Sequence, residues 1–378
     1  MQNKVAIIDA IGAHGSSHHF YLFGQAEGLL NSGVAVSLYT NNKTENPKIK
    51  GLKFHQLYNN LFTSKSRFFS GIKYILGSIL SIVHARITGY KVIHFHIFYA
   101  NILVLFNVIF AKILFGKVVL TVHDVSSFAA NSDHSLFIYK LSDAIITHNA
   151  FSKTELLTIQ GALNKKISII PHGNYIPFIQ VQKNQQISRE RLGIPQDKKV
   201  LLFFGMIKRA KGLEVLLEAL KDIVDKQPDI ILLIAGKVFK NDIRIYEKII
   251  EKNNLQQYCL MHTKFIPHED VPHYYCACNL VVLPYKKIYQ SGVLMMTLSY
   301  EKPALVSSLP PLKEIIKDGD TGFVFESENS QQLALKVIDV LKDTEQLEQV
   351  RRKGAQMMQE KYNWDELGNQ TKKVYQNM

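Results

Sequence analysis

Residues 200–225 read VLLFFGMIKRAKGLEVLLEALKDIVD and show the pattern from which most of the chain is built. An apolar run at residues 200–204 leads into a turn rich in glycine and cations. Residues 212–225 follow, with apolar side chains at helical spacing. The pattern predicts a strand, a turn and a helix. Because the strand is apolar on both faces, it is typical of a parallel sheet covered by helices on each side.

The same pattern recurs on both sides of a polar interruption at residues 174–199, which we interpret as a linker with one short helix. Apolar strands are predicted before it at residues 5–8, 34–39, 92–95, 118–122, 144–147 and 167–170, and after it at 200–204, 230–234, 280–283 and 304–306. Two such series predict an α/β protein with two Rossmann-like doubly wound domains facing across a cleft. We expect an N-terminal domain at 1–175, a C-terminal domain at 176–357, and a last helix, at about 358–378, that packs back on the first domain.

Composition limits the classes of protein to which the chain can belong. With 378 residues, 47% of them hydrophobic and 20% charged, it can bury two cores, which excludes a disordered protein. The net charge of +13 suits an anionic partner, such as nucleic acid, anionic lipid or a phosphorylated substrate. No stretch interleaves aromatic and basic residues as nucleic-acid binding requires, so we expect no nucleic-acid partner.

The sequence shows no sign of export. Its three cysteines form neither a disulfide framework nor the paired dyads of a structural zinc site, and residues 1–8 do not resemble a signal peptide. We therefore expect a cytoplasmic protein. Residues 97–115 are strongly apolar, but Asn101, Asn107 and Lys112 interrupt them. We expect a helix buried against the sheet there rather than a membrane span.

In an open parallel sheet, ligands bind beyond the carboxyl ends of the strands, so residues just after each strand are the candidates. In the first half these are Gly12 and Gly15 of a small-residue loop, His123, and His172. The glycines would let a phosphate or sugar approach the backbone, although a plain tight turn explains them equally well. His123 could orient or polarise a substrate, or it could be a satisfied loop histidine.

The second half offers a stronger set. Gly205, Lys208 and Lys211 lie between a strand and a helix, where cations and free backbone N–H groups suit a diphosphate; a solvated basic turn is the alternative. Tyr285 ends a strand, and Ser291, Gly292 and Val293 open the next helix. Phe265 and Pro267 follow another strand and could line a cleft. His94 and His96 share one strand face, but no cluster of carboxylates or cysteines accompanies them, so we expect no metal site.

In this order, these segments resemble glycosyltransferase family 4, the retaining enzymes of GT-B fold. The matching segments are 121–124, 170–173, 204–212, 283–285, 291–294, 302–306 and 314–322. The resemblance covers nearly the whole chain and is strongest in the second half. It implies that the chain is a glycosyltransferase. The C-terminal domain would hold a nucleotide-diphosphate sugar as donor, and the sugar would move to a glycan or lipid-linked acceptor at the N-terminal domain. No cofactor other than this donor substrate is implied.

The same resemblance implies roles for single residues. Lys208 and Lys211 would bind the diphosphate, and Ser291, Gly292 and Val293 would cradle phosphate oxygens. His123 is similar to the family's cleft histidine near the donor sugar. Cationic side chains can replace a metal ion in stabilising a departing phosphate, so we expect metal-independent transfer.

The sequence departs from the family at a pair of glutamates that many members carry eight residues apart. Alignment on 302–303 places Ile288 and Met296 at these positions. The Ser-Gly-Val segment at 291–293 fits a subset of the family that lacks both glutamates. Three alternatives remain open: a non-catalytic module that binds nucleotide-sugar or glycan, a sugar-nucleotide epimerase of GT-B fold, and a nucleic-acid-binding protein.

Residues 61–91 mix apolar side chains at helical spacing with cations. This composition fits an interfacial helix on the inner face of the plasma membrane, with an anionic membrane surface as a further partner. It fits equally well a helix that covers the sheet and whose cations are solvated.

Overall fold

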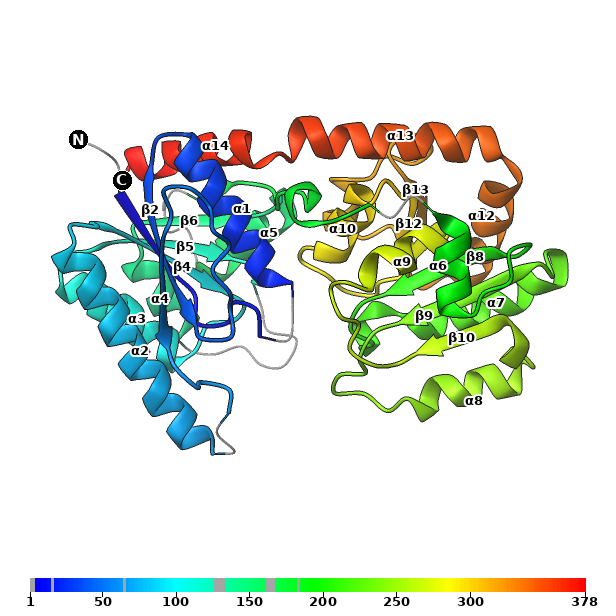
Figure 1. The fold of residues 1–378 in the computed structure, drawn as a ribbon, viewed down its shortest axis with the longest axis horizontal. Helices are drawn as coiled ribbons and strands as arrows, with labels where there is room; N and C mark the ends of the chain where they lie inside the picture. The colour runs from blue at the N-terminus through cyan, green and yellow to red at the C-terminus, as the bar shows by residue number, and fades with distance from the viewer. Residues whose placement is uncertain (1–3, 15–16, 64–65, 126–133, 161–166, 182–183) are drawn as a thin grey trace. The chain divides into compact units, whose positions relative to one another are not determined.

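The computed structural model describes residues 4–14, 17–63, 66–125, 134–160, 167–181 and 184–378. These residues form two compact units. The first unit comprises Met1–Gly173 together with Tyr362–Met378, and the second comprises Asn174–Lys361. Each unit is built around one parallel β-sheet with helices on both faces (Figure 1).

The sheet of the first unit has seven strands in the order β3-β2-β1-β4-β5-β6-β7, and all of its strand pairs are parallel. Its strands are β1 (Lys4–Ile8), β2 (Ala35–Asn41), β3 (Lys53–Tyr58), β4 (Val92–Ile97), β5 (Lys117–Val122), β6 (Ala144–Thr147) and β7 (Ile167–Ile169). Its helices are α1 (His18–Asn31), α2 (Arg67–Ile87), α3 (Ile102–Ile113), α4 (Ser135–Leu141), α5 (Ala150–Gln160) and α14 (Trp364–Gln376).

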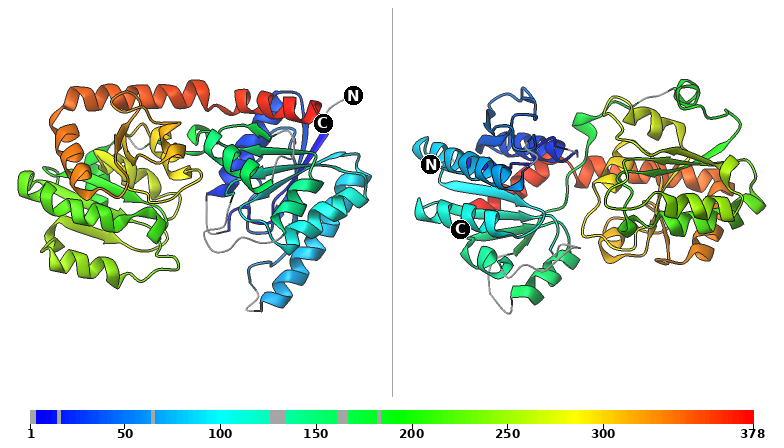
Figure 2. Two further views of the ribbon diagram at one scale, coloured as in Figure 1. Left: turned by 180° about the vertical axis from the view of Figure 1, so that it is seen from behind. Right: turned by 90° about the horizontal axis from the view of Figure 1, so that it is seen from below.

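Helices α1 and α14 pack together on one face of this sheet, and α2 and α3 lie side by side on the other (Figure 2). Glycines let α1 and α14 touch along their backbones. A Cβ at Gly28 would overlap the carbonyl of Trp364, and a Cβ at Gly368 would overlap the carbonyl of Gly28. The indole of Trp364 fills the space beside Gly24, and Tyr375 donates or accepts a hydrogen bond with His94 at 2.6 Å. The end of the chain therefore completes the core of the first unit.

The sheet of the second unit has six parallel strands in the order β10-β9-β8-β11-β12-β13. They are β8 (Lys199–Phe204), β9 (Ile230–Ala235), β10 (Cys259–His262), β11 (Leu280–Leu283), β12 (Ala304–Ser307) and β13 (Phe323–Phe325). The helical segments are η1 (Ile176–Phe178), α6 (Gln185–Leu192), η2 (Arg209–Lys211), α7 (Leu213–Lys226), α8 (Arg244–Lys252), η3 (Gln256–Tyr258), α9 (Val271–Ala277), α10 (Gly292–Ser299), α11 (Pro310–Lys313), α12 (Ser330–Lys342) and α13 (Thr344–Lys361).

Two expectations hold only in part. The helix expected at residues 97–115 is α3, but only one side of it is buried: Val108 and Ala111 are fully covered, whereas Ile113 is 63% exposed. The segment 174–199 is not a free linker, because α6 packs on α9 within the second unit. The buried Arg189 fixes it there, since its guanidinium donates hydrogen bonds to the carbonyl of Ala277 and to Oδ1 of Asn279.

Candidate functional site

The strand order of the second sheet changes direction between β8 and β11. From β8 the chain proceeds through β9 to β10 on one side, and it then returns to build β11, β12 and β13 on the other. The loops that follow β8 and β11 therefore diverge, and ligands of open α/β sheets bind in the crevice between such loops. These two loops contain most of the donor-site residues expected from the sequence.

Backbone contacts hold the two loops together. A Cβ at Gly212 would overlap the carbonyl of Pro284, and Gly212 has a φ of +66°, so both sterics and conformation require glycine there. The Lys286 N–H donates a hydrogen bond to the carbonyl of Ala210 at 3.0 Å. The cation-rich turn therefore has a fixed backbone beside the end of β11.

The two lysines of this turn lie against aromatic rings. Lys211 Nζ is 3.7 Å from the centroid of the Tyr285 ring, and Tyr285 is fully buried. Lys208 Nζ is 5.3 Å from the centroid of the Phe239 ring. Both lysines are half-buried, so the alternative of a fully solvated basic turn does not describe them. The aromatic faces hold the ammonium groups of the two lysines at the strand ends.

The N-terminus of α10 lies beside this turn. Ser291 caps the helix: its Oγ accepts a hydrogen bond from the Leu294 N–H at 3.1 Å and lies 3.4 Å from the Tyr285 hydroxyl. The N–H groups of Gly292 and Val293 belong to the first turn, where an anion is stabilised. A Cβ at Gly205 would lie 3.1 Å from the Val293 side chain, which shows how near the end of β8 is to this helix.

Seven of the expected donor residues thus lie on the two loops at this change of strand order: Gly205, Lys208, Lys211, Tyr285, Ser291, Gly292 and Val293. Phe265 and Pro267 do not join them, because they follow β10, two strands away from β8. Phe265 is 54% exposed, and the Pro267 carbonyl accepts hydrogen bonds at the start of α9.

The first sheet changes direction between β1 and β4. After β1, Asp9 Oδ1 accepts hydrogen bonds from the N–H groups of Ile11 and Gly12 at 2.9 and 2.7 Å, so Gly12 belongs to a tight turn. Gly15 lies outside the described residues. Asp9 also lines a pocket with Tyr99 and Asn107, and Asn107 Oδ1 has no hydrogen-bond partner among the described residues.

Histidines lie at or just beyond the ends of four neighbouring strands: His96 on β4, His123 after β5, His148 after β6 and His172 after β7. His123 is 2% exposed, and both of its ring nitrogens are used: Nε2 lies 3.0 Å from His96 Nδ1, and Nδ1 lies 3.1 Å from His148 Nε2. A direct contact between His123 and a sugar would therefore have to displace one of these neighbouring imidazoles.

Burial disfavours the charged form of these imidazoles. It lowers the pKa of His148 to about 4 and that of His172 to about 3, and it holds the pKa of His123 well below the usual range, where neighbouring histidines lower it further. The His172 Nδ1 donates to the Gly173 carbonyl at 2.7 Å. At neutral pH these rings are uncharged and act through hydrogen bonds.

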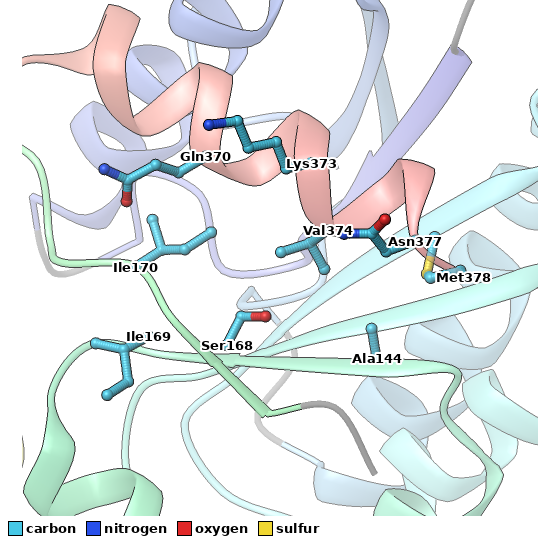
Figure 3. Close-up of a pocket in the computed structure, with 9 residues that line it drawn as sticks. All are labelled: Ala144, Ser168, Ile169, Ile170, Gln370, Lys373, Val374, Asn377 and Met378. Atoms are coloured by element: carbon cyan, nitrogen blue, oxygen red, sulfur yellow. The ribbon is translucent and has the colours of Figure 1, made fainter.

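A further hollow lies between the first sheet and α14, lined by residues that include Ala144, Ser168, Lys373 and Val374 (Figure 3). Ala144 begins β6 and Ser168 is in the middle of β7. The hollow reaches the carboxyl end of β7 only at Ile169 and Ile170, and none of the expected site residues lines it, so it is not part of the candidate site.

Comparison with known families agrees with this geometry. Residues 20–174 match the family described as Glycosyltransferase Family 4, and residues 184–357 match Glycosyl transferases group 1. The chain belongs to glycosyltransferase family 4. Together, the two matches span most of the chain.

Individual relatives are distant. Spore coat protein SA of Bacillus subtilis is 23% identical over 205 residues, which are 52% of this chain and 53% of that protein. The GDP-mannose:glycolipid 4-beta-D-mannosyltransferase of Xanthomonas campestris is 31% identical over 135 residues, 36% of this chain and 38% of that protein. The chain thus spans about half the length, or less, of these curated relatives.

A solved structure shows the same fold over the full length. Anabaena HepE in complex with UDP-glucose has a TM-score of 0.77 at 16% identity, covering 99% of this chain and 100% of that one. This family 4 member therefore has the GT-B fold, as its sequence predicted.

The positions of the absent glutamates are apolar in this family member. Met296 is buried within α10, and Ile288 is half-buried in the loop before it. Near them, Gln290 Oε1 is a buried acceptor without a hydrogen-bond partner among the described residues. A ligand hydroxyl or N–H group could satisfy this oxygen.

Sequence reasoning did not single out His18, Gln25 or His148, which the fold places beside His96 and His123. His148 follows an apolar strand, as His123 does, so the same rule would have found it. His18 and Gln25 are on α1, where only the packing of that helix shows what they contact.

Proposed function

We propose that this chain is a glycosyltransferase that moves a sugar from a nucleotide-diphosphate sugar to a glycan or lipid-linked acceptor in bacterial-type envelope polysaccharide synthesis. The observation that carries the proposal is the set of cations and helix N–H groups on the two loops at the change of strand order of the second unit. HepE, whose fold the chain shares, was solved with UDP-glucose, and the Xanthomonas relative is named for a glycolipid acceptor. Both names support the proposed substrates.

In the proposed reaction, the bond between the sugar carbon and the diphosphate breaks as the oxygen of an acceptor hydroxyl bonds to that carbon. The hydroxyl proton passes to an oxygen of the departing diphosphate. Negative charge then develops on the departing diphosphate. Lys208 and Lys211, with the N–H groups of Gly292 and Val293, stabilise this charge, because charge-assisted hydrogen bonds are strong where water is excluded. This arrangement supplies the positive charge that a metal ion would supply, so we propose transfer without a metal ion at the phosphate. The resemblance to family 4 supports transfer with retention of configuration.

We assign the first unit to the acceptor and to the sugar side of the reaction. His123 and His172 would act as positioning residues at the strand ends, since their ring nitrogens are engaged within the unit. The turn at Gly12 would place the backbone close to the acceptor. We place the protein in the cytoplasm, where nucleotide-sugars are made.

Incubation with a panel of nucleotide-sugars, with and without a glycolipid extract, tests the proposal. We expect release of free nucleotide diphosphate with one donor, and faster release when acceptor is present. A protein that binds a donor in a thermal-shift screen but never releases the diphosphate would instead be a non-catalytic binding module. Ile288 and Met296 favour that second candidate, because the two positions lack carboxylates. Accumulation of an isomerised nucleotide-sugar would indicate an epimerase.

We further propose that the first unit docks on an anionic membrane through α2 and α3. By length and composition, α2 is apolar enough to span a bilayer, but it packs on β3 and α3 at the surface of the unit. The two helices, which contact each other, expose large apolar side chains: Phe68, Phe69, Ile72, Leu76, Leu80, Val83 and Ile87 of α2, and Ile102, Ile109 and Ile113 of α3.

Cations lie beside this apolar surface. Arg67 and Lys73 are on α2, and Lys91 follows it, whereas Lys65 lies outside the described residues. Each cation near anionic lipid contributes about 1 kcal/mol, and apolar burial in the headgroup region adds to it. An anionic bilayer matches both properties of this surface.

We expect the protein to co-sediment with vesicles that contain phosphatidylglycerol at low salt and to release as salt rises, because charge interactions are screened over about 10 Å at 0.1 M. The double variant Arg67→Glu/Lys73→Glu should bind less. Lys221→Glu/Lys226→Glu, two exposed lysines of α7, is the matched control. Binding equal to that of the control, or no retention by vesicles even at low salt, would contradict the membrane proposal.

A further inference from the structure

The buried histidines of the first unit form a chain whose proton positions can be assigned. The carbonyl oxygen of Ile170 can only accept, and it lies 3.0 Å from His148 Nδ1, so this nitrogen carries a proton. In the neutral ring, His148 Nε2 is then an acceptor. It lies 3.1 Å from His123 Nδ1, which must donate to it. Nε2 of His123 is therefore left with a lone pair.

The other end of the chain gives a second lone pair. His96 Nε2 lies 2.9 Å from Gln25 Oε1, and an amide oxygen only accepts, so His96 Nε2 carries the proton and Nδ1 has the lone pair. His96 Nδ1 and His123 Nε2 face each other at 3.0 Å. Two lone pairs at this distance repel each other, unless a cation lies next to both nitrogens.

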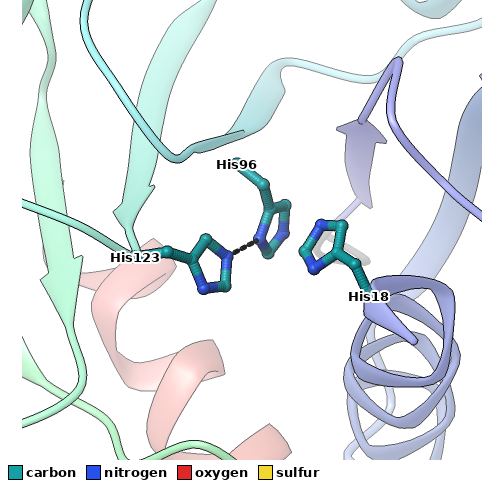
Figure 4. Close-up of side chains that lie close together, drawn as sticks. All are labelled: His18, His96 and His123. Atoms are coloured by element: carbon teal, nitrogen blue, oxygen red, sulfur yellow. Dashed lines mark hydrogen bonds between the residues drawn. The ribbon is translucent and has the colours of Figure 1, made fainter. Parts of the chain in front are cut away.

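A third imidazole approaches the same place (Figure 4). His18, His96 and His123 are all buried, and one ring nitrogen from each lies within 4.8 Å of the other two. Asp9 Oδ2 is 3.0 Å from His18 Nε2, so this nitrogen carries a proton and Nδ1 is the one that can bind a metal. Backbone N–H groups hold the other Asp9 oxygen, as described above, so the carboxylate fixes the orientation of the His18 ring.

We propose that His18, His96 and His123 together bind one transition-metal ion of the zinc type. Three imidazoles are a common ligand set for Zn²⁺, and the outer hydrogen bonds to Asp9, Gln25 and His148 are those that orient metal-binding histidines. Ligand nitrogens of a tetrahedral zinc site lie about 3.3 Å apart, given Zn–N distances of about 2.0 Å. The pair His96–His123 is already near this spacing at 3.0 Å. The His18 nitrogen lies within 4.8 Å of both, so it must move by at most about 1.5 Å to reach the same spacing.

This inference departs from the expectation drawn from the sequence, which had only His94 and His96 of one strand to consider. His94 is not part of the group, because its nitrogens bond Tyr375 and Thr121. The inferred ion belongs to the first unit and is separate from the proposed phosphate residues, which are all in the second unit. It would hold the ends of β4 and β5 to the start of α1.

The metal content of the full-length protein, purified without a histidine tag and dialysed against metal-free buffer, is the first test. We expect about one zinc per chain by mass spectrometry. After replacement by Co²⁺, we expect the visible absorption bands of a tetrahedral cobalt site. A wild-type protein that contains no zinc and shows no such bands with added Co²⁺ would overturn the proposal. In that case the Gln25 amide has the opposite orientation and the histidines form one continuous chain of hydrogen bonds.

Variants then test the ligands, with circular dichroism as the check on folding. His18→Asn should lose stoichiometric metal, whereas His55→Asn, a β3 histidine outside the group, should keep it. Gln25→Ala should weaken metal affinity by about 10- to 100-fold, because it removes only an orienting partner. Unchanged metal content in His18→Asn would overturn the assignment. If His18→Asn does not fold, the test depends on Gln25→Ala. A Co²⁺ affinity of this variant equal to that of the wild type would overturn the assignment.

Discussion

Replacement of Lys211 by alanine is the most direct test of the proposed phosphate site. The ammonium group of Lys211 lies 3.7 Å from the centroid of the buried Tyr285 ring, beside the capped start of α10. In the proposed reaction it stabilises charge that develops on the departing diphosphate. Loss of one such contact in a site that excludes water costs about 2–4 kcal/mol of transition-state stabilisation.

This cost corresponds to a turnover roughly 30- to 800-fold lower, since about 1.4 kcal/mol is a factor of ten in rate. The effect on folding should be small. Lys211 is half-buried, and its contact with the Tyr285 face contributes only about 0.5–1 kcal/mol to stability. Lys211→Arg keeps the charge and should retain more activity than Lys211→Ala.

Release of nucleotide diphosphate under saturating donor gives turnover, calorimetry gives nucleotide-diphosphate affinity, and thermal unfolding checks the fold. Lys221→Ala, on the exposed side of α7 in the same unit, is the matched control and should behave as wild type. A folded Lys211→Ala protein with near-wild-type turnover would refute the placement of the diphosphate on these loops.

Three further predictions concern the histidines and the metal requirement. His123→Ala should reduce transfer severely but leave nucleotide-diphosphate affinity nearly unchanged, because the nucleotide is assigned to the other unit; equal losses of both would mean that the histidine is only structural. Transfer should not depend on Mg²⁺ or Mn²⁺ at the phosphate, which is a separate place from the buried site inferred at His18, His96 and His123. A loss of activity in chelator that Mg²⁺ or Mn²⁺ restores would contradict metal-independent chemistry. Acidification from pH 7 to 5 should destabilise the first unit. Burial lowers the pKa of His94 and His172 to about 3 and that of His148 to about 4 in the folded protein. In the unfolded chain these histidines have the ordinary pKa of about 6.5, so below that pH the unfolded chain binds more protons than the folded one. The free energy of unfolding is therefore highest above that pKa and falls as the pH decreases, by about 1.4 kcal/mol per pH unit for each of these histidines. Denaturant midpoints that do not change with pH would contradict this prediction.

The central strands could be predicted because they are apolar on both faces. Strand β8 begins and ends within one residue of the expected bounds, and β1 and β5 each begin one residue earlier than expected. Strand β3 (Lys53–Tyr58) was not predicted, because it is an edge strand with polar residues on a half-exposed face. At the two edges of the other sheet, β13 was missed, and β10 was expected only as the strand before Phe265, without bounds.

In the candidate site, too, some residues could be predicted from the sequence and others could not. Lys208, Lys211 and Ser291 could be found because each follows a predictable strand, and parallel strands bring their carboxyl ends to one edge. The half-exposed face of α3 could not be foreseen, since helical spacing shows an apolar side without showing what covers it. The contact of His18 with His96 and His123 depends on how α1 packs on the sheet, which neither segment encodes alone.

The packing of α14 against α1 bears on how the chain is made. During synthesis, the whole of the second unit leaves the ribosome before Trp364 and Tyr375 do, yet these two residues fill the first unit beside Gly24 and His94. The nascent first unit must therefore wait with an uncovered groove along α1 while nearly two hundred later residues are added and fold. Exposed apolar surface of this kind is what chaperones recognise and what leads to aggregation. The core of the first unit is therefore completed only after the second unit has been synthesised, although most residues of the first unit are made earlier.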